Sequence, residues 1–142
     1  MKRDNVPRDD EVERLRVPPH STEAEQSVLG GLLIDPAAFD HAGELLADSD
    51  FYRLEHRLIF GAIRSLVQAG KPADTVTVFE HLQSLGRAED AGKLKYLNDL
   101  AQCVPSAANI RRYAEIVRER AVLRKLIAAS DEIATMGFNR EG

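Results

Sequence analysis

The stretch VPPHSTEAEQSVLGGLL, residues 17–33, sets the strongest limits on how this chain can fold. Pro18 and Pro19 hold the backbone extended ahead of it, because proline fixes its own φ and restricts the residue before it. Thr22 is the predicted N-cap of a helix, and Glu25 follows three residues later, at the spacing of a capping box. Apolar side chains then recur at helical spacing, at positions 24, 28, 29, 32 and 33. We therefore expect an extended segment followed by a helix with one buried face.

Two adjacent glycines, Gly30 and Gly31, lie inside this predicted helix. Each costs about 1 kcal/mol relative to alanine in a helix interior. Close approach by a neighbouring helix would offset that cost, since no side chain keeps the two backbones apart. The alternative is a kink or an early end of the helix. We favour the close approach.

The bulk properties indicate a single globular domain. A chain of 142 residues with 44% hydrophobic and 30% charged residues can bury a core of its own. It has no apolar run long enough for a membrane span and no signal peptide, so we expect no membrane partner. A formal net charge of −4 argues against a nucleic-acid-binding module, because phosphate contacts require concentrated positive charge. The single cysteine, Cys103, suits a reducing cytoplasm, and its spacing from Leu100 predicts a buried side chain.

Helical patterns account for most of the chain beyond its start. Residues 1–16 carry five basic and five acidic side chains, and we predict a disordered charged arm there. Asp35 and Pro36 predict the cap and first position of a short amphipathic helix. Residues 74–85 begin with strand-like alternation but continue at helical spacing, and a lone strand would have no partner, so we predict a helix. The result is an all-α bundle of about six helices, of which the last, residues 106–136, is long.

The last helix changes its apolar face part way along. Up to position 121 one face is apolar, formed by Ile110, Tyr113, Ala114, Val117 and Ala121. Beyond it the apolar positions lie on roughly the opposite side, at Val122, Leu123, Leu126, Ile127, Ile133 and Ala134. A straight helix cannot bury both faces against one body. Either the helix bends near Arg120, or its second half packs on a partner subunit or on a further segment of the same polypeptide, which we favour.

Basic residues are also concentrated on the last helix and alternate with acidic ones. They are Arg111, Arg112, Arg118, Arg120, Arg124 and Lys125, interleaved with Glu115 and Glu119. One interpretation is a solvated face laced by ion pairs within the helix, worth a few tenths of a kcal/mol each. The other is a contact surface for an acidic partner.

The sequence contains no recognisable catalytic motif. No G-x-x-x-x-G-K-[ST] phosphate-binding loop occurs, and the four histidines lack the spacing of a zinc site. We expect His56, near Tyr52, to make a structural hydrogen bond rather than to act in catalysis. We therefore predict no catalytic, cofactor-binding or metal-binding residue in this chain.

Several ordered segments resemble one known family. They are PPHSTEAEQSVLGGLL, DFYRLEHRLIF from Asp50, residues 97–100 within KYLNDL, VPSAANI from Val104, and IVRERAVLRKLI from Ile116. Together they resemble the N-terminal domain of the bacterial replicative DNA helicases of the DnaB family, over nearly the whole chain from residue 17.

The resemblance implies a non-catalytic collar domain, residues 17–136, on a ring-shaped hexamer built as a trimer of dimers. Residues 137–142 would begin the linker to a RecA-like motor domain. That missing domain would bind ATP and Mg, contact DNA and unwind it at the replication fork in the cytoplasm. The collar itself would mediate subunit pairing and primase docking and, in some systems, contacts with the helicase loader.

The resemblance also implies roles for particular residues. The residues implied for partner contact on the last helix are Ile127, Ile133, Arg120 and Arg124. Leu94, in the predicted loop entering the fifth helix, is implied for subunit pairing. The chain departs from the family at residues 91–93, Ala-Gly-Lys, where paired glycines are common, and the lysine makes that entrance more polar.

Two other functions remain open at this stage. One is a free-standing helical adaptor, or the similarly folded helicase-binding domain of a primase. The other is a helix-turn-helix DNA-binding protein, which would require a short basic recognition helix. Salt dependence of DNA binding separates the second from the collar, because a DNA-binding protein loses affinity steeply as salt rises.

Overall fold

Helix α2 (Thr22–Ile34) is the element around which the others pack. In the computed structural model, which describes residues 17–103 and 109–140, α2 contacts α3, α5, α6 and the turn that follows it. The helix begins as the sequence predicts, but Ser21 rather than Thr22 caps it, with the Ala24 N–H donating to Ser21 Oγ at 3.1 Å. Glu25 is then not part of a capping box. It lies on the buried face of the helix.

The glycine pair in α2 permits the predicted close approach of neighbouring elements. A Cβ on Gly30 would collide with the main-chain carbonyl oxygen of Leu100 in α5 (Lys93–Ala101). A Cβ on Gly31 would lie 2.7 Å from Cδ1 of Ile110, at the start of α6. The helix continues through both glycines to Ile34, so they mark packing rather than a helix end.

The segment after α2 forms three 3₁₀ turns instead of the single amphipathic helix expected from the sequence. They are η1 (Pro36–Asp40), η2 (Gly43–Leu45) and η3 (Asp48–Asp50). Asp35 caps η1 as predicted, since its Oδ1 accepts the Ala37 N–H. Phe39, Ala42 and Leu46 still reach the core from these turns, so the apolar positions of the segment are buried as its pattern indicated although the backbone is not one continuous helix.

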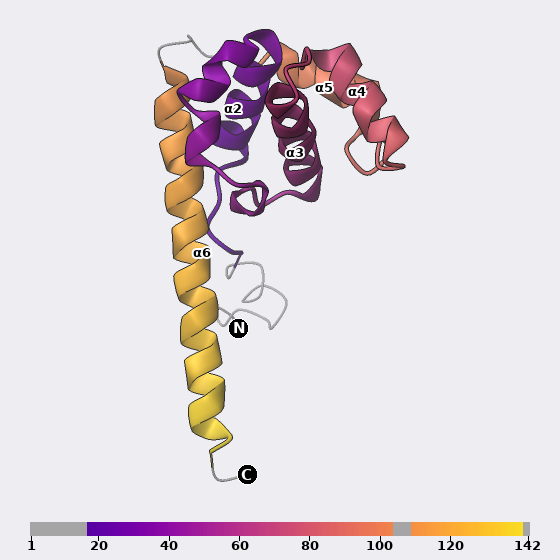
Figure 1. Ribbon diagram of the computed structural model, residues 1–142. Helices are drawn as coiled ribbons and strands as arrows, with labels where there is room; N and C mark the ends of the chain where they lie inside the picture. The colour runs from indigo at the N-terminus through magenta and orange to yellow at the C-terminus, as the bar shows by residue number, and fades with distance from the viewer. Residues whose placement is uncertain (1–16, 104–108, 141–142) are drawn as a thin grey trace, which may run out of the picture.

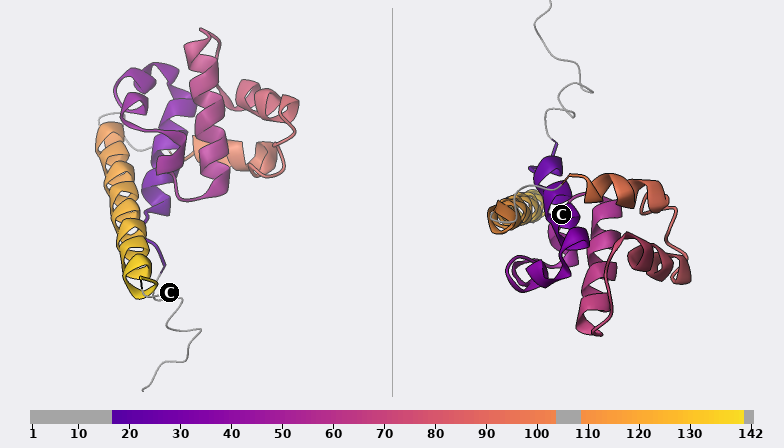
Figure 2. Two further views of the ribbon diagram at one scale, coloured as in Figure 1. Left: turned by 60° about the horizontal axis from the view of Figure 1, so that its bottom comes forward. Right: turned by 90° about the horizontal axis from the view of Figure 1, so that it is seen from above.

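The remaining helices of the head follow the predicted order. Helix α3 (Leu54–Gln68) ends ahead of Gly70, which has φ of +71°. Helix α4 (Thr75–Ser84) forms despite its β-branched start, because Asp74 and Thr77 make a reciprocal capping box. These helices and α5 lie on the side of α2 away from α6 (Figure 2).

Two sequence-based expectations around α5 are wrong. Leu94 lies in the first turn of α5 and not in the preceding loop, because the helix begins at Lys93, directly after Gly92. Cys103 is exposed rather than buried. Helix α5 ends at Ala101, so helical spacing from Leu100 no longer decides where the Cys103 side chain points. The expected end of this helix at residues 104–105 and the predicted start of the next at residues 106–108 lie outside the described residues.

Helix α6 (Ile110–Phe138) is a single straight rod that projects well past the rest of the molecule (Figure 1). Its 29 residues span roughly 43 Å at 1.5 Å per residue. It ends two residues beyond the predicted end at position 136. We call the packed body formed by α2 to α5 and the start of α6 the head, and residues 125–138 of α6 the stalk.

Candidate protein-interaction surface

The two halves of α6 have opposite relations to the head. In the first half, Ile110, Ala114, Val117 and Ala121 are buried, and the helix contacts α2, η2 and η3. Among the described residues of α6 beyond Ala121, none is buried. The helix is straight past Arg120 (Figures 1 and 2). Of the two alternatives predicted from the sequence, the bend near Arg120 is therefore wrong.

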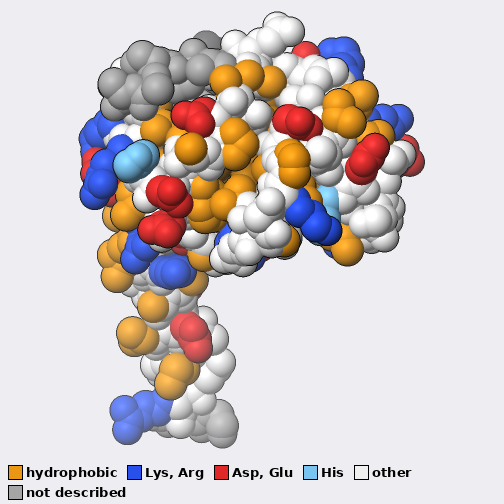
Figure 3. All heavy atoms as spheres, turned by 45° about the horizontal axis from the view of Figure 1, so that its top comes forward, with side chains coloured by type: hydrophobic (Ala, Val, Ile, Leu, Met, Phe, Trp, Pro, Cys, Tyr) orange, Lys and Arg blue, Asp and Glu red, His pale blue; other side chains and the backbone are white. Residues whose placement is uncertain are grey.

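Large apolar side chains are exposed on α6 beyond Ala121, on the stalk and on the turn just before it. We define the stalk surface by the members of this group, which are Val122, Leu123, Leu126, Ile127, Ile133, Met136 and Phe138. Their exposed fractions run from 43% at Val122 to 87% at Phe138. Apolar atoms are visible along the stalk in the space-filling view (Figure 3). Exposed apolar patches are typical of sites that contact other proteins, so the stalk surface is the candidate contact site.

Ile127 and Ile133, the two apolar residues implied for partner contact, both lie on this surface. Ile127 is 49% exposed and Ile133 is 69% exposed. Leu94 lies elsewhere, half-buried in the first turn of α5. Helix α5 is part of the head and lies away from the stalk, so the structure does not bring Leu94 into one surface with the stalk residues (Figure 1).

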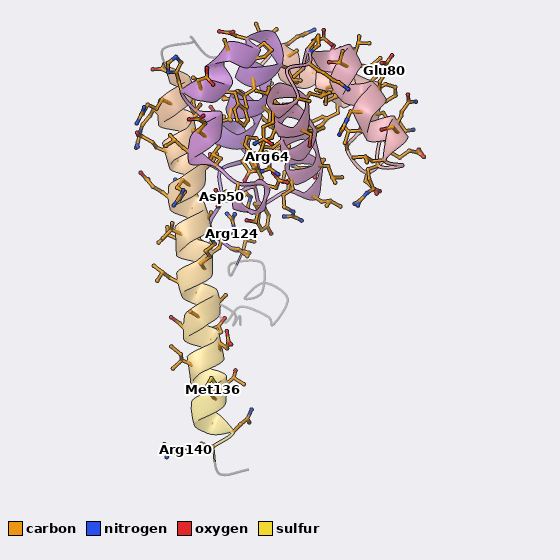
Figure 4. All side chains as sticks on the ribbon, viewed as in Figure 1. Asp50, Arg64, Glu80, Arg124, Met136 and Arg140 are labelled. Carbon is orange, nitrogen blue, oxygen red and sulfur yellow. The ribbon has the colours of Figure 1, made fainter. Side chains whose placement is uncertain are left out.

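Arg124 faces the head rather than solvent (Figure 4). Its Nη1 donates to the Pro19 carbonyl at 2.9 Å and its Nη2 donates to the Asp50 carbonyl at 2.7 Å. Arg120, one turn earlier, is half-buried.

The first half of α6 shows the ion pairs expected of a solvated helical face. Arg112 lies 3.4 Å from both Glu115 and Glu119, and Arg111 lies 3.7 Å from Glu115. Arg118 instead donates to the main-chain carbonyl of Leu45 at 2.9 Å. Arg111, Arg112 and Arg118 therefore all interact with groups of the same chain.

A buried polar cluster in the head was only partly expected. His56 makes the predicted structural hydrogen bonds, with Glu25 Oε1 2.7 Å from Nδ1 and the Tyr96 hydroxyl 2.6 Å from Nε2. The other carboxylate oxygen of Glu25 accepts the Tyr52 N–H at 2.7 Å. The sequence signal for it is that Glu25 shares the helical face of Ala24, Val28 and Leu29.

Glu, His and Tyr side chains in a row can relay protons, but the burial of this cluster indicates a structural role. Burial raises the pKa of the Tyr96 phenol, so the hydroxyl is a poorer nucleophile than a free tyrosine. Glu25 and His56 are almost wholly enclosed. The cluster joins α2, α3 and α5, and we assign it to the stability of the head.

Within residues 17–103 and 109–140, no group of three or more His, Cys, Asp or Glu side chains is arranged to hold a metal ion. None of the helices in that part of the chain is long and apolar enough to cross a bilayer.

In its described residues the chain is an all-α domain, a helical head with a projecting stalk that exposes apolar side chains. The model of the DnaB-like helicase N-terminal domain matches residues 17–119, which is most of the chain. The chain belongs to this family. The match ends at residue 119, so the stalk surface lies beyond it.

Individual relatives agree with this assignment. The replicative DNA helicase DnaB of Pasteurella multocida is 46% identical over 126 residues, which are 89% of this chain and 27% of the relative. The crystal structure of the N-terminal domain of DnaB helicase from Mycobacterium tuberculosis superposes with a TM-score of 0.85 at 41% identity, covering 88% of this chain and 89% of that one.

A longer solved structure is also similar. It is a DnaB-like replicative helicase studied with its interactions with primase, with a TM-score of 0.70 and 25% identity over 83% of this chain and 28% of that chain. The present chain spans only 27–30% of the length of the curated relatives it matches.

Proposed function

We propose that this chain is the N-terminal collar domain of a hexameric replicative DNA helicase, and that it is a protein-interaction domain without catalytic groups. The observation that carries the proposal is the exposed apolar stalk surface on a chain of this family. ATP hydrolysis with Mg, DNA binding and unwinding at the fork would belong to a motor domain elsewhere in the polypeptide. The whole protein would act in the cytoplasm.

The stalk surface is suited to two kinds of occupant. A second copy of the chain presents the same apolar residues, so two stalks can bury them against each other, as a two-fold interface requires. Three such pairs would complete a hexamer. Primase is the second occupant, a proposal supported by the similar helicase that was studied with its primase interactions.

Leu94 and Arg120 are proposed as additional contacts. Leu94 is half-buried near the start of α5 and leaves part of its side chain available on the head. Arg120 is half-buried at the base of the stalk. Leu94→Asp should weaken subunit pairing, measured by sedimentation velocity, if the head takes part in that interface.

Titration of the chain with primase from the same organism tests the docking proposal. Ile127→Asp and Ile133→Asp should each weaken binding measured by isothermal titration calorimetry, because a buried carboxylate without a partner is costly. Val76→Asp is the matched control, since Val76 is an apolar residue on α4 that is 55% exposed and lies away from the stalk. Loss of binding in the Val76 variant with normal binding in the stalk variants would place primase on the head instead.

A further inference from the structure

Arg124 occupies the boundary between the anchored and projecting halves of α6. It follows Ala121, the last buried residue of the helix, by three positions and precedes the exposed Ile127 by three. Beyond it the stalk continues for 14 residues to Phe138, roughly 21 Å at 1.5 Å per residue. A small rotation of the helix at Arg124 therefore becomes a large displacement at the tip.

The guanidinium of Arg124 joins three parts of the chain at this boundary (Figure 4). One of its two carbonyl partners, Pro19, belongs to the extended segment ahead of α2. The other, Asp50, ends η3 and leads into α3. A planar guanidinium can donate to two separate acceptors at once in a fixed geometry, which a lysine ammonium cannot hold as rigidly.

Aromatic contacts support the same arrangement. The guanidinium lies over the Tyr52 ring, 5.5 Å from its centroid, and the His20 ring stacks on Tyr52 at 4.0 Å. His20 Nδ1 is 2.8 Å from the Pro18 carbonyl, which fixes the ring to the extended segment. Residues 17–20 are thereby tied both to the head, through Tyr52, and to α6, through Arg124.

Beside Arg124 an open groove of about 590 Å³ lies between α6 and the start of the extended segment ahead of α2. Its lining residues are Val17, Pro18, Arg124, Ile127, Ala128 and Asp131. Among the described residues, the two hydrogen bonds of Arg124 are the last polar contacts between α6 and the head along the helix.

We propose that Arg124 is the positioning residue that fixes the direction in which the stalk leaves the head, through its bonds to the Pro19 and Asp50 carbonyls. Because Pro19 is one of the two partners, a shift of residues 17–20 would then change the direction of the stalk. The consequence for assembly rests on the proposed function, because stalk direction matters to pairing only if the stalk carries the interface. The geometric claim does not.

Distance measurement by pulsed electron paramagnetic resonance tests the geometric claim directly. Spin labels are placed at Gln68 on α3 and Thr135 on the stalk, both exposed, in a Cys103→Ser background. Excess unlabelled chain dilutes the labels, so that only distances within one chain are recorded. This separates failure of the positioning role from failure of the pairing interface.

We expect Arg124→Ala to shift the mean distance and broaden the distribution, with circular dichroism showing unchanged helix content. Arg124→Lys should fall between alanine and wild type, and it carries the test if the alanine variant does not fold. Arg118→Ala is the matched control, because Arg118 also donates to a main-chain carbonyl of the head but from the anchored half of α6. We expect it to match wild type. A wild-type distribution in Arg124→Ala or Arg124→Lys, or an equal change in Arg118→Ala, would overturn the proposal.

Discussion

Glu25 and His56 face each other across the contact between α2 and α3, with 2.7 Å between Oε1 and Nδ1 and almost no exposure of either side chain. Because a carboxylate oxygen accepts, the His56 Nδ1–H donates to Oε1, and Nε2 is left to accept from the Tyr96 hydroxyl. The other carboxylate oxygen, Oε2, accepts the Tyr52 N–H. Every member of the buried cluster then has a partner. Burying polar groups is tolerated only when they are satisfied in this way.

Removing Glu25 should therefore destabilise the head strongly. Glu25→Ala leaves His56 and the Tyr52 N–H without an acceptor, and we expect a loss of about 3–5 kcal/mol in the free energy of unfolding. Urea denaturation followed by circular dichroism measures it. The control is Glu23→Ala, an exposed acid in the same first turn, which should cost less than about 1 kcal/mol. Equal losses in the two variants would show that the cluster adds nothing.

Alanine substitution should affect stability differently at Gly30 in α2 and at Gly137 in α6. Gly30→Ala would gain about 1 kcal/mol of helix propensity but drives Cβ into the Leu100 carbonyl, and we expect a net loss of about 1–2 kcal/mol because the packed backbones must separate. Gly137 has nothing within 4 Å of a built Cβ, so Gly137→Ala should cost nothing and slightly increase the helical signal. Thermal melts of the two variants, compared with wild type, give the signs. A Gly30→Ala variant as stable as wild type would mean that α2 and α5 can move apart freely.

The cap of α4 should give a pH-dependent contribution to stability. The hydrogen bond from the Thr77 N–H lowers the pKa of Asp74 below its usual value, which is about 3.9 for an unperturbed aspartate. A depressed folded-state pKa means that the carboxylate stabilises the fold above the unfolded pKa and that this contribution is lost as the pH falls through the folded pKa.

Asp74→Asn keeps a capping acceptor but does not titrate. We expect the stability difference between wild type and Asp74→Asn to be constant from neutral pH down to about pH 5 and to change in favour of the variant below about pH 4. Asp74→Ala should cost about 1 kcal/mol at neutral pH. Urea unfolding at a series of pH values checks both, and a difference independent of pH would contradict the role given to the carboxylate.

Much of the fold could be predicted because helix signals in this chain are locally consistent. The β-branched start of α4 suggested a strand, but the helical spacing of the apolar residues that follow and the absence of a partner strand in the pattern favoured a helix, and the structure confirms it. The turns at η1 to η3 could not be predicted, since their geometry depends on how Phe39 and Leu46 reach a core formed by distant elements.

The candidate site was predictable in part for a similar reason. The shift of apolar positions beyond Ala121 is a property of one helix, so sequence alone indicated an unpartnered face. Whether the helix bent depended on its packing against the head, and only the structure shows that it is straight. The two-carbonyl contact of Arg124 joins residues 105 and 74 positions apart, which no local pattern encodes.

The most direct measurement is sedimentation velocity of the wild-type chain and of the Ile127→Asp/Ile133→Asp double variant over a range of concentrations. We expect the wild type to shift towards a dimer as concentration rises, and the double variant to remain monomeric with an almost unchanged melting temperature, because neither residue is part of the core. Identical sedimentation of the two proteins would contradict pairing through the stalk surface.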